Sequence, residues 1–218
     1  GVTLEQILEL QDFIQETLLK HDLVDPAVGV DGSSRAQSIT WEDLTMYQVR
    51  DHFIMPLTKT SKCSFVEVVA QGKQQPPMWM LSHWWGTPFN FTVRMLELQA
   101  RSRHLHHAAS VSYWCDTFAN NPHVEAQELD EGDVLKSAFA RAMLSPGCMG
   151  TVLLCDPKVT PLLRTWCVFE AHITQQLRSG ALADRTDKKK YFLDILATSL
   201  HRDPEDSRRQ RVTITMLQ

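Results

Sequence analysis

The stretch VLKSAFARAMLSPGCMGTVLLC, residues 134–155, decides the fold class, because a helical pattern runs almost directly into a buried strand. Residues 134–144 carry apolar side chains at three- and four-residue steps, which predicts an amphipathic helix. The tripeptide SPG at 145–147 ends that helix. Residues 150–155 (GTVLLC) are continuously apolar, which is typical of a strand buried on both faces of a parallel sheet. A helix followed by such a strand is the repeating unit of an α/β protein.

The alternation of strand and helix patterns continues on both sides of this stretch. Apolar runs predict further strands and helical periods predict further helices: strands at 78–82, 111–116, 190–196 and 212–216, and helices at 89–103 and 162–177. Short links between these elements favour right-handed crossovers, and therefore a flavodoxin-like α/β fold whose parallel sheet has helices on both faces. Ligands of such sheets bind at the carboxyl ends of the strands, which here are 82–86, 116–121 and 155–157.

The pattern changes at residue 77, so we expect an N-terminal helical extension over 1–77 and an α/β domain over 78–218. Within the extension, the sequence predicts an amphipathic helix at 3–20 that Thr3 caps, a loop at 25–38, a helix at 40–54 that Pro56 ends, and a short strand or helical turn at 64–70. The amphipathic pattern alone suggests that the helices within residues 1–56 have an autoinhibitory or oligomerising role.

Composition and charge are those of a folded domain. Of the 218 residues, 43% are apolar and 22% are charged, and six are Trp, which allows a substantial core. The net charge of −4 argues against a general nucleic-acid binder. The short basic groups at 188–190 and 208–211 stand beside Asp and Glu, as on a solvated face. No apolar run reaches the ~20 residues of a membrane span and no signal-peptide pattern opens the chain, so we expect neither nucleic-acid nor membrane partners.

Cysteine and histidine spacing predicts a protein of a reducing, cytoplasmic compartment without a bound metal. The five cysteines include no C-x-x-C pair, which argues against a disulfide framework or a zinc ribbon. Three of them lie in apolar runs, where a thiol behaves as a small buried hydrophobe. The nearest approach to a metal-binding group, HLHH at 104–107, points its imidazoles in different directions on a helix and has no carboxylate at a suitable spacing.

The segment RTWCVFE, residues 164–170, carries the most informative carboxylate. On a helix, Trp166 and Glu170 share a face one turn apart, and the apolar residues beside Glu170 predict that it is buried. Burial raises the pKa of a carboxyl group and lets it act near neutral pH. An ion pair with Arg164 is the structural alternative. The sequence lacks the phosphate-binding G-x-x-x-x-G-K-[ST], the dinucleotide-binding G-x-G-x-x-G and the hydrolase G-x-S-x-G.

The order of these motifs resembles a Toll/interleukin-1 receptor (TIR) domain. In that family a strand of the type F-L-S-x-x-G opens the domain, a helix ending in Ser precedes an apolar strand, and S-x-W-C-x-x-E-L follows. This chain has MLS at 80–82 with Gly86, the helix and strand of 134–155, and RTWCVFE at 164–170. The resemblance covers about residues 78–177. It departs from the family pattern at His83-Trp84-Trp85 and in the long loop from Asn120 to Asp133.

The resemblance implies an enzyme that cleaves the nicotinamide–ribose bond of NAD, with Glu170 as the catalytic residue and NAD as substrate, so that no separate cofactor is needed. A carboxylate stabilises the oxocarbenium character that develops on the ribose. The residues expected to contact the substrate lie near the strand ends and the motif: Ser82, His83, Trp84, Trp85, Asp116, Asn120 and Trp166. Core packing is the alternative for the tryptophans, and it is favoured for Trp79 and Trp114.

Three functions stay open at this point. The first is a TIR-like NAD glycohydrolase or cyclase. The second is a non-enzymatic TIR-like module that signals by assembling with like domains, which makes homo-oligomers an expected partner. The third is a related nucleoside- or nucleotide-processing glycosidase, of a deoxyribosyltransferase-like kind, that uses the same carboxylate chemistry. Selectivity between nucleotides would separate the third function from the first.

Overall fold

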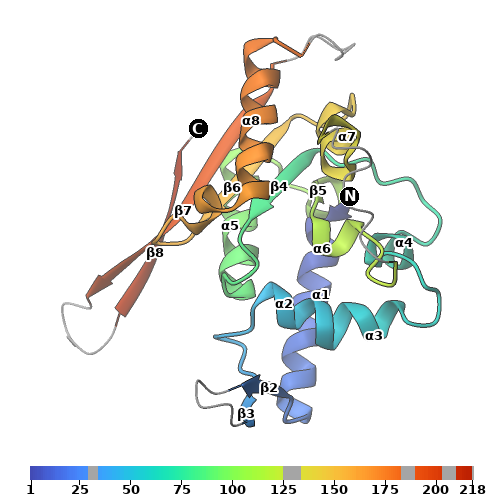
Figure 1. Ribbon diagram of the computed structural model, residues 1–218, viewed down its shortest axis with the longest axis vertical. Helices are drawn as coiled ribbons and strands as arrows, with labels where there is room; N and C mark the ends of the chain where they lie inside the picture. Colours follow the sequence, from blue (N-terminus) through green and yellow to red (C-terminus); the bar gives the residue numbers. More distant parts are fainter. Residues whose placement is uncertain (29–33, 125–133, 183–189, 203–209, 218) are drawn as a thin grey trace.

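A computed structural model describes residues 1–28, 34–124, 134–182, 190–202 and 210–217. Its main feature is a six-stranded sheet with the strand order β1-β5-β4-β6-β7-β8 (Figure 1). The strands are β1 (Val2–Thr3), β4 (Trp79–His83), β5 (Ser112–Trp114), β6 (Gly150–Cys155), β7 (Phe192–Arg202) and β8 (Gln210–Leu217). The acidic end of the predicted 120–133 loop and most of the basic groups at 188–190 and 208–211 lie outside the described residues.

Four strands of the sheet are parallel, which confirms the predicted α/β class. β4 pairs in parallel with β5 on one side and with β6 on the other, and β7 continues the parallel part beyond β6. This order is compatible with a flavodoxin-like fold. In such a fold, successive parallel strands are added first on one side of the first parallel strand and then on the other, as β5 and β6 lie on opposite sides of β4 here. The two outermost strands differ from the expectation, because β1 and β8 are both antiparallel to their neighbours.

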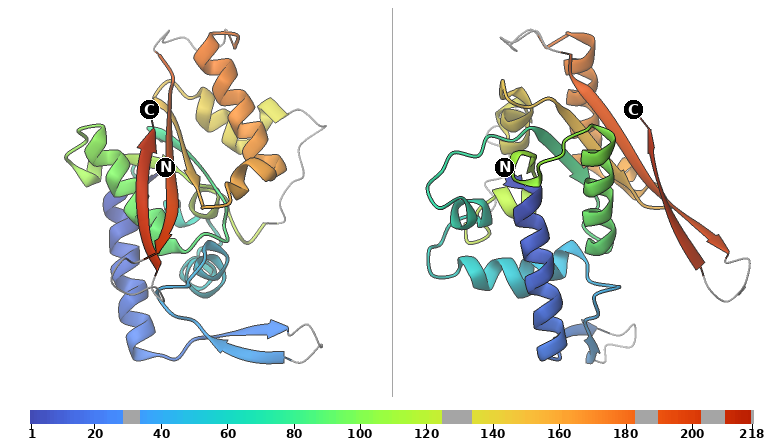
Figure 2. Two further views of the ribbon diagram at one scale, coloured as in Figure 1. Left: turned by 90° about the vertical axis from the view of Figure 1, so that its left-hand side faces the viewer. Right: turned by 180° about the vertical axis from the view of Figure 1, so that it is seen from behind.

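Helices cover both faces of the sheet, as predicted (Figure 2). One face carries α1 (Leu4–Lys20) and α5 (Phe89–Ser102), and the other carries α7 (Ala138–Leu144) and α8 (Thr165–Ser179). Alternation along β4 divides the core accordingly. Trp79 and Leu81 join the core below α1 and α5, whereas Met80 joins the smaller core below α7 and α8. Trp79 and Trp114 are both buried, as the core interpretation required.

The first 77 residues are joined to the sheet through one core. α1 begins with a capping box in which the Thr3 hydroxyl accepts from the backbone N–H of Gln6, and its buried face includes Ile7 and Ile14. These side chains belong to the same core as Trp79 and Leu81, and β1 extends the sheet itself. Residues 64–70, expected as a strand or a helical turn, form the short helix α4 (Phe65–Ala70).

Two expectations for this region are wrong. The segment 25–38, predicted as a loop, contains the antiparallel hairpin β2 (Val24–Val28) and β3 (Ser34–Ser38), with residues 29–33 outside the described residues. The predicted helix 40–54 begins only at α2 (Met46–Val49) and passes through a π-helical turn (Arg50–Ile54) into α3 (Met55–Thr58). Pro56 does not end the helix, since it stands in the first turn of α3.

The remaining described helices are short. They are α6 (Asp116–Ala119) and the 3-10 turns η2 (Ala108–Ser110), η4 (Val134–Lys136) and η5 (Thr160–Leu163). The turn η4 forms the first three residues of the predicted helix 134–144. The turn η5 overlaps the first two residues of the predicted helix 162–177. Within the described residues, the structure has no helix with the length and apolar character to cross a bilayer. All five cysteines are described, and none is joined in a disulfide.

Candidate functional site

Ser82 and Glu170 meet near the carboxyl end of β4, on the α8 side of the sheet. Ser82 is two residues beyond Met80, so it faces the same helices, and Glu170 lies in the second turn of α8. The Ser82 hydroxyl donates a hydrogen bond to Oε2 of Glu170, and the two residues are only 2% and 8% exposed. β4 is flanked by β5 and β6, so this contact lies where flavodoxin-like sheets bind their ligands.

Burial makes Glu170 an unusual carboxylate. Loss of solvent raises its pKa from the ordinary value of 4.5 to about 8, and the negative charge of Asp116 acts in the same direction. The hydrogen bond from Ser82 opposes both effects, because it stabilises the ionised form. The ion pair with Arg164 considered from the sequence is not among the ion pairs of the described residues. Glu170 is therefore a buried acid whose one described side-chain hydrogen bond comes from a hydroxyl group.

His83, Cys115 and Asp116 form a second group at the ends of β4 and β5. One potential ligand atom from each residue lies within 4.8 Å of the other two. His83 is 7% exposed, and its Nε2 atom is buried without a hydrogen-bond partner among the described residues. Burial lowers the pKa of His83, although the charge of Asp116 opposes the shift, and burial raises the pKa of the Cys115 thiol well above its usual range.

Trp85 ties this second group to the first 77 residues. Its Nε1 donates to both carboxylate oxygens of Asp116, at 3.1 and 3.0 Å. Its indole makes an edge contact with the ring of Tyr47 on α2, at a centroid distance of 5.3 Å. The backbone N–H of Met46 donates to the carbonyl of Trp85 at 2.9 Å. The loop after β4 is therefore held in place by α2.

The other predicted substrate residues lie apart from these two groups. Trp84 is half-buried, with its indole over Gly86. Trp166 is half-exposed and makes ring contacts with Phe139 on α7 and with Phe169. Asn120 is exposed at the end of α6. In the described part of the chain, no side-chain hydrogen bond or ring contact joins Trp84, Trp166 or Asn120 to Glu170 or to Asp116. The backbone N–H of Asn120 donates to the carbonyl of Asp116 at 3.0 Å, which ends α6.

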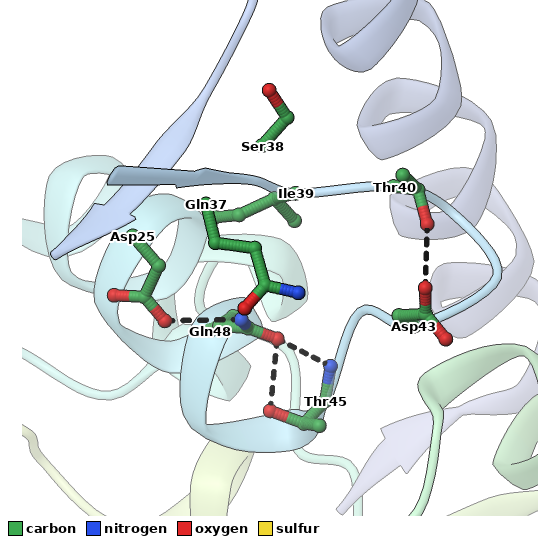
Figure 3. A pocket seen from close by; sticks show the side chains of 8 residues that line it. All are labelled: Asp25, Gln37, Ser38, Ile39, Thr40, Asp43, Thr45 and Gln48. Atoms are coloured by element: carbon green, nitrogen blue, oxygen red, sulfur yellow. Dashed lines mark hydrogen bonds between the residues drawn. The ribbon is translucent and has the colours of Figure 1, made fainter. Parts of the chain in front are cut away.

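The hairpin β2–β3 borders a separate polar pocket of about 130 Å³ (Figure 3). Gln48 on α2 donates to Asp25 at 3.0 Å, and its side-chain oxygen accepts from the backbone N–H of Thr45 at 2.8 Å. Thr40 donates to Asp43 at 3.2 Å. These polar groups satisfy one another and fix the hairpin to α2, and no residue of the predicted site lines the pocket.

Sequence reasoning missed Cys115 as a functional candidate. A cysteine in the apolar run 111–116 has the pattern of a core residue, and it is indeed fully buried. Only the parallel pairing of β4 with β5 brings its thiol to His83, which is 32 positions earlier in the chain. The HLHH segment at 104–107 is not part of any group of three potential metal ligands in the residues that the structure describes.

Comparisons of the chain with protein-family models, with curated proteins and with solved structures gave no match. The TIR resemblance therefore stays a prediction that rests on the order of motifs in the sequence.

Proposed function

We propose that the chain is a TIR-like NAD glycohydrolase or cyclase in which Glu170 is the catalytic carboxylate. The observation that carries the proposal is the buried contact between Ser82 and Glu170 near the carboxyl end of β4. Burying a carboxyl group lowers the stability of a fold. A buried carboxyl group near the carboxyl ends of parallel strands is therefore typical of a functional site. We further propose a reducing, cytoplasmic setting, with which the absence of disulfides among the five cysteines agrees.

The proposed reaction breaks the bond between C1′ of the ribose and the ring nitrogen of nicotinamide. The bonding electron pair goes to that nitrogen, so nicotinamide leaves as a neutral molecule and needs no proton. Positive charge develops on the ribose, and the ionised Glu170 carboxylate stabilises it. Water then attacks C1′, releases one proton to solvent and yields ADP-ribose, or a nucleophile of the adenine ring attacks C1′ and closes a cyclic product.

Ser82 is a positioning residue in this scheme, because its hydroxyl holds one carboxylate oxygen and favours the ionised form. The pyridinium charge of bound NAD is expected to act in the same direction, so substrate binding prepares Glu170 for the step. The proposal also includes, from the TIR resemblance, a set of substrate-binding residues: His83, Trp84, Trp85, Asp116, Asn120 and Trp166.

The test is nicotinamide release from NAD by the purified chain, compared with Glu170→Ala, Glu170→Gln and Ser82→Ala. Glu97→Gln on α5, across the sheet, is the matched control. We expect release to vanish in both Glu170 variants and to fall in Ser82→Ala, with circular dichroism unchanged. Release that is equal in wild type and both Glu170 variants would exclude Glu170 as the catalytic group. Faster cleavage of simple nucleosides than of NAD would favour the nucleoside-processing alternative.

A specific observation also favours the assembly module as a second candidate. Apolar side chains are exposed around the start of α8, where Leu163 is 82% exposed and Trp166 and Val168 are each about half exposed. Monomers seldom leave several large apolar side chains exposed together. If assembly is the function, Leu163→Asp lowers the self-association measured by analytical ultracentrifugation, and no protein concentration gives nicotinamide release.

A further inference from the structure

We propose that His83, Cys115 and Asp116 bind one transition-metal dication of the zinc class at the carboxyl ends of β4 and β5. The inference uses none of the atoms of the Ser82–Glu170 contact and does not depend on the proposed function.

The topology brings the three residues together. β4 and β5 are neighbouring parallel strands, with Trp79 opposite Tyr113 and Met80 opposite Trp114. Their carboxyl ends therefore reach the same edge of the sheet, His83 from β4 and Cys115 with Asp116 directly after β5. Alternation places His83 and Cys115 on the α5 side, together with Leu81 and Tyr113. Glu170 approaches from the opposite side.

The spacing of the ligand atoms suits a tetrahedral ion. One nitrogen, one sulfur and one oxygen atom lie within 4.8 Å of one another. Zinc bonds of 2.0–2.3 Å in a tetrahedron leave neighbouring ligand atoms roughly 3.5 Å apart, so a bound ion would draw the ligand atoms together by at most about 1 Å. Three protein ligands leave a fourth position for water, as in zinc sites that are open to solvent.

An unsatisfied atom supports the site independently of the spacing. Nε2 of His83 is buried and has no partner among the described residues, which costs free energy unless something binds there. A dication accepts a lone pair from a ring nitrogen of His83, a lone pair of Asp116 and a lone pair of the Cys115 sulfur. The thiol proton leaves to solvent on binding. One dication then faces one carboxylate, one thiolate and one neutral imidazole, so the loaded site carries no net charge in its buried position.

The ligand set also selects the class of ion. Mg²⁺ and Ca²⁺ prefer oxygen ligands, whereas a mixture of imidazole, thiolate and carboxylate suits Zn²⁺ and Co²⁺. The side chains around the ligands resemble the outer hydrogen bonds of metal sites, because Trp85 Nε1 and the backbone N–H of Thr117 both donate to Asp116 and fix its carboxylate. Asp116 is half-buried, so an ion can reach the group from solvent.

The experiment is titration of the whole chain, stripped of metals, with Co²⁺ and then Zn²⁺. We expect one Co²⁺ per chain, a sulfur-to-cobalt charge-transfer band in the near ultraviolet, visible bands of tetrahedral intensity, and loss of both when Zn²⁺ displaces Co²⁺. Cys115→Ser should abolish the charge-transfer band, and Asp116→Asn should weaken binding at least about 10-fold, the smallest effect usual for metal-site partners.

Matched variants separate this site from other binding. Cys148→Ser alters another fully buried thiol, which lies in the core below α7 and α8, and Cys63→Ser alters a half-buried one. Replacing His104 and His106 with Gln removes two of the three histidines of the HLHH segment. All these variants should keep the cobalt spectrum of wild type.

The proposal is overturned if wild type gives no charge-transfer band. It is equally overturned if the band survives in Cys115→Ser, or disappears in Cys148→Ser, in Cys63→Ser or in the His104 and His106 variant. If Cys115→Ser does not fold, Asp116→Asn decides, since it changes one atom of a half-buried side chain. Binding to Asp116→Asn as tight as to wild type then refutes the site.

Discussion

The change Glu170→Gln should alter how the stability of the protein depends on pH. The native protein holds a proton on Glu170 up to a pKa of about 8, because burial disfavours the charge, whereas the unfolded chain releases that proton near 4.5. Between these values the unfolded state binds fewer protons than the native state, so stability falls as pH rises. Gln is neutral at every pH and nearly isosteric with Glu, and its side-chain oxygen can still accept from Ser82.

The size of the effect follows from the raised pKa. Each pKa unit corresponds to ~1.4 kcal/mol, so ionisation of Glu170 costs wild type ~3 kcal/mol of unfolding free energy by pH 7. The loss reaches ~5 kcal/mol near the folded pKa of about 8 and then stays constant. Below pH ~4.5 both states hold the proton and the group makes no contribution.

Urea unfolding of both proteins, followed by circular dichroism from acid to mildly alkaline pH, measures this difference. The stability of Glu170→Gln minus that of wild type should grow steadily between pH ~5 and ~8. In Ser82→Ala the carboxylate loses its hydrogen bond, so the upper end of this pH range should move further up. A stability difference between Glu170→Gln and wild type that is independent of pH would refute the reasoning, since Glu170 would then ionise as it does in water.

Three further outcomes follow from the described contacts. Gly150→Ala should lower the free energy of unfolding by about 1–3 kcal/mol, because its Cβ would lie 2.6 Å from a backbone oxygen. Gly147→Ala, whose Cβ would lie 3.8 Å from the nearest atom, should be nearly neutral in thermal denaturation. Arg103→Met should cost about 3–5 kcal/mol in urea unfolding, since it leaves the fully buried Asp194 without its cation. If Glu170 acts as a carboxylate, kcat/KM for NAD should rise with pH and level off above about 8, and a flat profile would contradict that role.

Much of the sheet could be predicted because its central strands are short, apolar and separated by clear helical periods. β6 and β4 have no polar side chain that needs solvent over most of their length, so their burial is evident in the sequence. β1 could not be predicted, since a strand of two residues is too short to show an alternating pattern. The antiparallel direction of β8 could not be predicted either, because it depends on the pairing with β7 and not on the residues of β8 alone. The β2–β3 hairpin was missed because Pro26 and the neighbouring Gly and Ser residues are typical of loops.

The candidate site divides in the same way. Glu170 could be found because a charged residue stands among apolar neighbours at helical spacing, and its burial was predicted. Ser82 was indicated by the strand end at 82–86 and by the TIR resemblance, but its contact with Glu170 was not predicted, since 88 positions separate the two residues. The grouping of His83 with Cys115 and Asp116 depends on which strands are neighbours, and strand order is a property of the whole chain.

The pairing of β1 with β5 has a consequence for how the protein is made. Val2 pairs with Tyr113, so β1 takes its place in the sheet only after the more than one hundred residues between them have been added. A ribosome releases the amino end first, and until β5 has emerged the apolar side of α1, with Ile7 and Ile14, has no sheet to cover it. The growing polypeptide therefore exposes the apolar face of α1 to solvent for many seconds. Chaperones bind apolar surfaces of this kind.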